Sequence, residues 1–240
     1  MQNVQQIVPI SELSSPLKSE TSLNINIGLK YNPTKKLSFD LNLFNNKVND
    51  LIEWQLVAKA INNTNIYSYF NINEVETKGI EFNTTYKPSI NYEIKIGYQL
   101  LYAYDTEVSR RFETEEIYAN DINGVSFKLN QDDYFGLFNR SRHMGNIKLN
   151  YHLNDKTDLN AMLTYRSKYA LSDSNANGFL DTYDEFIDGH NLCDVGITHE
   201  ISSLKSFQIG VKNIFGFTNP EYISNISGRL YYINFKIDFK

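Results

Sequence analysis

Apolar and polar residues alternate with a period of two along most of this chain, and no other feature constrains the fold as strongly. The alternation is clearest from Tyr92 to Tyr104, where every second residue is apolar or aromatic and most residues between them are polar or small. A period of two places successive side chains on opposite faces of a β-strand. Helical stripes of comparable length are not visible, so the sequence predicts an all-β chain.

Nine segments carry this pattern and are predicted to be strands. They are residues 22–31, 37–50, 66–87, 92–105, 143–153, 158–168, 191–201, 206–213 and 229–239. Aromatic residues favour strands and disfavour disorder, and they make up 14% of the chain.

The links between the predicted strands alternate strictly in length. Short links fall at 32–36, 87–91, 154–157 and 202–205, and long links fall at 45–65, 105–142, 167–190 and 214–228. A soluble sandwich has no reason to sort its links in this way, whereas an outer-membrane barrel joins its strands by short periplasmic turns and long external loops. No apolar run is long enough for a transmembrane helix. The sequence therefore predicts a transmembrane antiparallel β-barrel, with a soluble β-domain as the alternative.

Aromatic residues on the apolar faces lie next to or near the short links. They are Tyr31, Phe39, Tyr86, Tyr92, Tyr151, Phe207 and Phe239. Aromatic rings favour the headgroup level of a membrane, so these residues are expected to form the periplasmic girdle. The opposite faces are polar, as Asn146, Lys148 and Asn150 show, and are expected to line the lumen.

The number of predicted strands is odd. If the chain ends on the periplasmic side, the first of the nine strands begins outside. A bacterial barrel that closes on itself has an even number of strands and so leaves no unpaired edge. We therefore expect the chain to be the C-terminal part of a longer polypeptide.

Charge and histidine placement argue against two classes of function. The 23 Lys and Arg residues are outnumbered by 28 Asp and Glu, which leaves a net charge of −5 and no basic stripe for nucleic acid. His143, His152, His190 and His199 are scattered, and no nucleophile or acid–base partner stands at a recognisable spacing from them. We therefore expect neither nucleic-acid binding nor enzyme activity and assign no catalytic residue.

One loop has the spacing of a calcium-binding loop. Residues 173–184 fit D-x-[DN]-x-[DN]-G with an apolar eighth position and acidic ninth and twelfth positions. The candidate Ca²⁺ ligands are Asp173, Asn175, Asn177, Phe179 through its backbone carbonyl, Asp181 and Asp184. The alternative is a loop rich in Asn, Asp and Gly because these residues form turns.

Five segments match short motifs in a fixed order. Residues 17–22 (LKSETS) match L-K-P-E-x-S, residues 44–52 (FNNKVNDLI) match F-x-N-x-x-x-D-L-I, Asn71-Ile72 with residues 78–82 (KGIEF) match N…x-G-x-E, residues 211–215 (VKNIF) match V-x-N-L-F, and residues 228–232 (GRLYY) match G-R-x-Y-Y. Taken in this order across nearly the whole chain, they resemble the late barrel strands of TonB-dependent outer-membrane receptors.

The resemblance implies a 22-stranded barrel in the bacterial outer membrane, with residues 1–240 as its last nine or so strands and with the plug domain outside this chain. It implies binding and energised uptake of a scarce solute of the siderophore, haem, cobalamin or glycan class. The implied partners are outer-membrane lipid, the plug and N-terminal strands of the receptor, TonB through the plug, and a small-molecule or glycan solute. A passive porin-like barrel or a structural or adhesive surface β-protein is the alternative.

Overall fold

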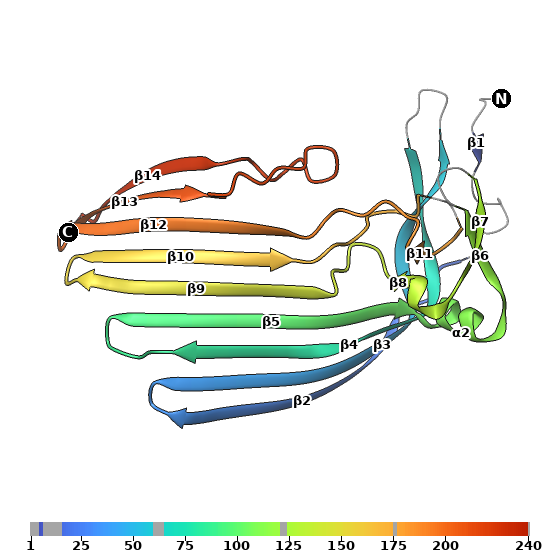
Figure 1. The fold of residues 1–240 in the computed structure, drawn as a ribbon, viewed down its shortest axis with the longest axis horizontal. Helices are drawn as coiled ribbons and strands as arrows, with labels where there is room; N and C mark the ends of the chain where they lie inside the picture. The colour runs from blue at the N-terminus through green and yellow to red at the C-terminus, as the bar shows by residue number, and fades with distance from the viewer. Residues whose placement is uncertain (1–4, 7–15, 60–64, 121–123, 175–176, 240) are drawn as a thin grey trace.

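The computed structural model describes residues 5–6, 16–59, 65–120, 124–174 and 177–239, and it confirms the all-β chain. Nine long antiparallel strands form most of one ten-stranded sheet (Figure 1). They are β2 (Thr21–Thr34), β3 (Leu37–Lys59), β4 (Asn65–Tyr86), β5 (Tyr92–Asp105), β9 (His143–Asn154), β10 (Thr157–Arg166), β12 (His190–Ser202), β13 (Lys205–Lys212) and β14 (Leu230–Ile237). The tenth strand, β1 (Gln5–Gln6), pairs with the end of β3.

Each long strand pairs with the next long strand along the chain. The sheet is therefore a wall of consecutive hairpins that runs from β2 to β14 and does not close on itself within the described residues. The short links lie at one end of the wall and the longer segments at the other (Figure 1). This placement is the one expected from the alternating link lengths, and it is typical of a barrel wall.

One face of the wall is covered by apolar side chains that the register aligns into rows. One row crosses six neighbouring strands and contains Tyr92, Tyr151, Leu159, Ile197, Ile209 and Ile233. These side chains are not covered by a second layer, and Ile233 is 74% exposed. The opposite face is polar, where Glu81 pairs with Gln99 and Asn150 pairs with Asn160. An exposed apolar face opposite a polar one is the arrangement of a membrane barrel wall.

The link predicted at 45–65 is mostly strand, which corrects the sequence analysis. β3 continues to Lys59 and pairs with β4 from Asn65 onwards. The extended hairpin turns across the ends of the other strands (Figure 1). Asp50 lies at the position where the predicted strand ended, and its φ of 54° is in the left-handed region that Asn and Asp tolerate.

Three of the five motif segments meet beside Asp50. Asn71 Nδ2 donates to the carbonyl oxygens of Asp50, at 2.6 Å, and of Lys18, at 3.0 Å. Its Oδ1 accepts from the Lys18 backbone N–H at 2.8 Å. Glu20 Oε1 accepts from the Ile52 backbone N–H at 2.6 Å. These bonds attach the segment before β2 to both strands of the extended hairpin.

The other two motif segments shape the link between β13 and β14. Asn213 has a φ of 49°, and its Nδ2 donates to the carbonyl oxygens of Phe217, at 2.7 Å, and Ser227, at 2.9 Å. Arg229 Nε donates to the Ile214 carbonyl oxygen at 2.9 Å. A predicted long loop is thus held closed by the two motif side chains at its ends.

The described part of residues 105–142, which the sequence predicted as a long link, contains regular structure. It includes helix α2 (Thr106–Thr114), strands β6 (Ile117–Asn120) and β7 (Ser126–Leu129), the 3₁₀ turn η1 (Gln131–Asp133) and β8 (Tyr134–Gly136). Strand β11 (Leu180–Asp181), from the link 167–190, pairs with β8. No helix among the described residues is long and apolar enough to cross a membrane.

Candidate functional site

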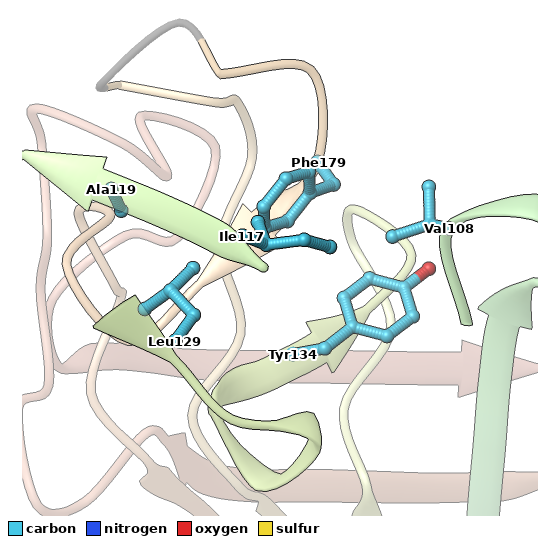
Figure 2. Close-up of a cluster of buried hydrophobic side chains, with 6 residues drawn as sticks. All are labelled: Val108, Ile117, Ala119, Leu129, Tyr134 and Phe179. Atoms are coloured by element: carbon cyan, nitrogen blue, oxygen red, sulfur yellow. The ribbon is translucent and has the colours of Figure 1, made fainter. Parts of the chain in front are cut away.

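Two long links fold together into one unit at the end of the wall. We call it the cap, and it comprises the described parts of residues 105–142 and 167–190. Its core holds Val108, Ile117, Ala119, Leu129, Tyr134 and Phe179 (Figure 2). Phe112 packs on this core, with its ring centroid 5.7 Å from that of Tyr134 and 5.5 Å from that of Phe179. Phe179 comes from the second link, so the apolar core joins the two links.

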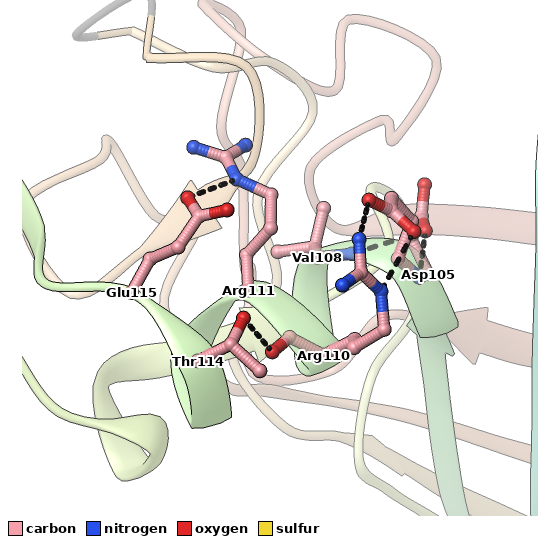
Figure 3. A network of polar contacts seen from close by, with 7 residues as sticks. Asp105, Val108, Arg110, Arg111, Thr114 and Glu115 are labelled. Atoms are coloured by element: carbon pink, nitrogen blue, oxygen red, sulfur yellow. Dashed lines mark hydrogen bonds and ion pairs between the residues drawn. The ribbon is translucent and has the colours of Figure 1, made fainter.

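Helix α2 starts at the end of β5 because Asp105 caps it. The Asp105 carboxylate accepts hydrogen bonds from the backbone N–H groups of Glu107, at 2.8 Å, and Val108, at 3.3 Å (Figure 3). Such a cap satisfies N–H groups that have no partner within the helix. The Tyr134 hydroxyl also accepts from the Asp105 backbone N–H at 2.9 Å. Burial raises the pKa of the Tyr134 hydroxyl.

Most charged side chains of α2 and the segment after it pair with one another. Arg110 binds Glu107, and Arg111 Nε lies 3.5 Å from a carboxylate oxygen of Glu115 (Figure 3). The hydrogen bond from Arg110 lowers the pKa of Glu107. These exposed charges are therefore paired with one another, and such pairs contribute little to stability.

The candidate calcium loop lies in the cap, and its side chains bind backbone N–H groups. Asp173 accepts from Gly178 N at 2.7 Å, Asp181 from Tyr183 N at 2.7 Å, and Asp184 from Asp181 N at 2.8 Å. Asp181 is fully buried. Gly178 adopts a φ of 93°, which glycine alone among the residues accommodates freely.

The Asn177 side chain also bonds within the loop. Asn177 Nδ2 donates to Asp181 Oδ2 at 2.6 Å, and Asn177 Oδ1 accepts from Phe179 N at 3.2 Å. Asn175 lies outside the described residues. Within the described part of the chain, no three His, Cys, Asp or Glu side chains are grouped as a metal site would need. Calcium binding by this loop stays a prediction.

A groove of about 640 Å³ opens on the polar face of the wall. Its lining comes mainly from β4, β5, β9, β10 and β12. Gln99 Nε2 donates to Glu81 Oε1 at 2.9 Å, and Arg166 Nε donates to Ser141 Oγ at 2.7 Å. Gly97 lets the Asn83 and Asn146 side chains approach the backbone of β5, because a Cβ at this position would lie 2.7 Å from Asn146 Nδ2. The groove can offer amide, carboxylate and guanidinium groups to a polar solute.

A second pocket of about 410 Å³ lies between β5, α2 and β8. Lys78, Arg140 and Arg142 line it together with Tyr102, Tyr104 and Phe135. The Arg142 guanidinium carbon lies 5.0 Å from the centre of the Tyr102 ring and 5.2 Å from that of the Phe135 ring. The sequence analysis did not predict that these residues meet, because segments far apart in the chain supply them.

The four histidines do not meet. His143 pairs with Tyr98, His152 with Asp158, and His199 with Thr157. His190 stacks on Phe217 with a ring distance of 4.3 Å. Each histidine thus has a local structural contact, and we assign a catalytic role to none of the four.

Comparison with solved structures gives the same fold. The chain superposes on the ferric enterobactin receptor of Pseudomonas aeruginosa in complex with enterobactin with a TM-score of 0.64 and 18% identity, over 93% of this chain and 32% of that one. The copper transporter OprC gives 0.64 and 14%, over 93% and 32%. The siderophore receptor PirA from Pseudomonas aeruginosa gives 0.58 and 14%, over 92% and 30%. The chain thus spans about a third of these receptors.

Comparison with curated proteins gives no match. A family model gives a long one: the TonB dependent receptor-like β-barrel matches residues 5–214. This match covers most of the wall and the whole cap. The chain belongs to the TonB-dependent receptor β-barrel family of the bacterial outer membrane.

Proposed function

We propose that this chain supplies about nine C-terminal wall strands to a 22-stranded receptor that binds a scarce solute outside the cell and takes it up with energy delivered through TonB. TonB-dependent receptors are transporters rather than enzymes, bind small-molecule solutes such as siderophores and interact with TonB. The chain spans only part of such a receptor, so uptake by the complete protein is the proposal.

One observation carries this proposal: a folded cap stands at the end of the wall, above a polar groove on the lumen-facing side. The cap has its own apolar core and is continuous with β5, so it presents an ordered surface. A passive pore needs an open mouth, whereas a receptor needs ordered groups at the mouth to contact its solute. The arrangement therefore favours binding over passive diffusion.

We propose that the solute contacts the cap first and the groove afterwards. Ferric enterobactin, other siderophores and copper are named for structures that share this fold. For the receptor that contains this chain, we propose a solute of the siderophore, haem, cobalamin or glycan class. The groove offers Asn83, Gln99 and Asn146, whose amides can both donate and accept hydrogen bonds.

We further propose that the wall closes through strands of the same receptor and that a plug domain fills it. Both outer strands, β2 and β14, present unpaired backbone groups along one side within the described residues. Such edges cannot face lipid, because no water is available there to bind the backbone N–H and C=O groups. These edges support the remainder of the receptor as the partner of the chain, with the plug as the part that would contact TonB.

Uptake by the complete receptor in its own host tests the proposal. A strain that lacks the receptor is supplied with one labelled solute at a time from the four classes. We expect the complete receptor to restore uptake of one class and loss of TonB to abolish that uptake. Uptake that continues without TonB would identify a passive barrel, and no uptake of any class would identify a structural or adhesive protein.

Two matched variants then locate the solute path. Gln99→Leu removes an amide within the groove, and Gln208→Leu removes an amide from the same polar face outside it. Each glutamine has one side-chain partner, Glu81 for Gln99 and Asn234 for Gln208. We expect several-fold slower uptake for Gln99→Leu only. Equal uptake by both variants would show that the groove is not on the path.

A further inference from the structure

The second pocket lies at the outer rim of the membrane-facing side of the wall. Lys78 pairs with Tyr102 across β4 and β5, and both stand two residues beyond the apolar pair Ile80 and Leu100. Because alternate residues of a strand share a face, Lys78 and Tyr102 point to the same side as the apolar rows. Tyr104 is the next residue on this side of β5, and it packs against the cap core. The pocket thus starts where the apolar surface ends.

The lining of this pocket is cationic. Lys78, Arg140 and Arg142 contribute three positive charges, and Glu113 is the acidic residue of the lining. Among the residues that the structure describes, none of the ion pairs includes these three cations. Glu76, on the same side of β4, accepts from Tyr104 Oη at 2.6 Å and from Asn45 Nδ2 at 2.8 Å. Glu76 also attracts the nearby Lys78 ammonium, which hydrogen-bonds to Tyr104. Three cations face the two carboxylates Glu113 and Glu76, so the site keeps a net positive charge for a bound anion.

Aromatic rings hold two of these cations in place. The Lys78 ammonium lies 5.1 Å from the centre of the Tyr104 ring, and the Arg142 guanidinium stands over Tyr102 and Phe135. Arg142 Nη2 also donates to the Phe135 carbonyl oxygen at 3.4 Å. Other cations of the cap differ, since Arg110, Arg111 and Lys128 each pair with a carboxylate. Lys78 and Arg142 thus differ from the cations of the cap surface, because aromatic rings rather than ion pairs hold them.

We propose that this pocket binds the phosphate-bearing headgroup of an anionic lipid in the outer leaflet. A lipid whose acyl chains cover Ile80 and Leu100 places its headgroup at the level of Lys78 and Tyr102. Phosphate forms strong charge-assisted hydrogen bonds with guanidinium and ammonium groups, and tyrosine rings favour this level of the membrane. The volume of about 410 Å³ holds a phosphate together with the sugar or glycerol that carries it.

Position decides between a lipid and the transported solute. The side chains that β4 and β5 give to the pocket, Lys78, Tyr102 and Tyr104, stand on the side of the wall that carries the apolar rows, whereas the groove for the solute lies on the polar face. A lipid reaches the pocket by diffusion within the leaflet. The inference needs the family membership and the membrane orientation of the wall, but it does not need the proposed solute.

Native mass spectrometry of the complete, delipidated receptor in detergent tests the inference. The probe is bisphosphorylated lipid A, compared with the same glycolipid after removal of both phosphates. We expect binding of the phosphorylated form, with an affinity about tenfold lower in the double variant Lys78→Gln/Arg142→Gln. The control Arg110→Gln removes one charge that is already paired, so it should bind as the unchanged receptor does.

Three results would overturn the inference. Equal binding of the dephosphorylated glycolipid would leave only an apolar contact, and full binding by the double variant would place the anion elsewhere. Competition by millimolar inorganic phosphate as effective as that by the lipid would make this a site for free anions. A heat-dependent gel shift verifies folding of each variant, and the exposed Lys78→Gln alone serves if the double variant does not fold. Solute uptake should not change in Lys78→Gln alone, because Lys78 lies on β4 outside both the cap and the groove, and this result separates the inference from the proposed function.

Discussion

The two faces of β5 give a direct test of membrane insertion. The outward apolar positions on this strand are Tyr92, Ile94, Ile96, Tyr98 and Leu100. A rise of about 3.3 Å per residue gives roughly 26 Å along the strand, and a tilt of about 40° turns this length into roughly 20 Å of height. Ile96 is the central position, so roughly 10 Å of apolar wall lies on either side of it.

We expect Ile96→Arg in the complete receptor to lower the free energy of unfolding by about 2–4 kcal/mol, because the guanidinium enters the middle of the lipid. The matched control is Gln99→Arg on the same strand. Gln99 faces the polar side and bonds to Glu81, which an arginine can also bind, so we expect a change within about 1 kcal/mol.

The assay is folding into lipid vesicles at increasing urea, followed by the gel shift between the folded and the heated protein. Both variants introduce the same charge on the same strand, so any difference between them reports the face. Equal costs for Ile96→Arg and Gln99→Arg would refute the assignment of the apolar rows to lipid. A larger cost at Gln99 would reverse the two faces.

Three further predictions concern local contacts. Asp105→Ala removes the N-cap of α2 and should destabilise the helix by about 1 kcal/mol. We expect faster amide hydrogen exchange in residues 106–114 and unchanged exchange in the wall. Equal exchange rates in the variant and the unchanged receptor would contradict the capping role. Asn71→Ala removes the hydrogen bonds to Lys18 and Asp50 and should lower the free energy of unfolding by about 2 kcal/mol. Protease should then cut before β2 at a lower urea concentration. Asn83→Ala, which removes no such bridge, serves as the control. Calcium in the millimolar range should protect residues 173–184 from protease in the complete receptor and not in its Asp173→Ala variant, with an affinity on the order of 10⁻⁴–10⁻³ M; no protection with calcium relative to chelator would leave turn formation as the role of these side chains.

The sequence predicted the membrane part of the wall because lipid enforces a strict pattern there. Every outward position between Tyr92 and Leu100 must be apolar, so alternation is visible without any knowledge of the partner strands. Beyond the membrane both faces of a strand meet water or the cap. The extension of β3 past Asp50 alternates only over residues 52–56, and this short pattern was interpreted as part of a long link.

The cap was missed for a related reason. Helix α2 has nine residues, and only Val108 and Phe112 mark its apolar side, which is too few to establish a helical period. Its packing partner Phe179 comes from another link, so the contact has no local signature. The short motifs were informative together, because Lys18, Asp50 and Asn71 come from three different motifs and form one hydrogen-bonded cluster.

The loop at 173–184 shows why a motif can match in sequence and still leave the ligand open. A calcium loop and a tight turn both need short oxygen-bearing side chains and a glycine, because both must satisfy charge or backbone N–H groups within a few residues. Here Asp173, Asp181 and Asp184 accept backbone hydrogen bonds, and Phe179 anchors the loop in the cap core. Calcium would have to compete with these bonds for the same oxygen atoms. Any affinity is therefore set by the cost of releasing the turn, which is why we expect binding only near millimolar calcium.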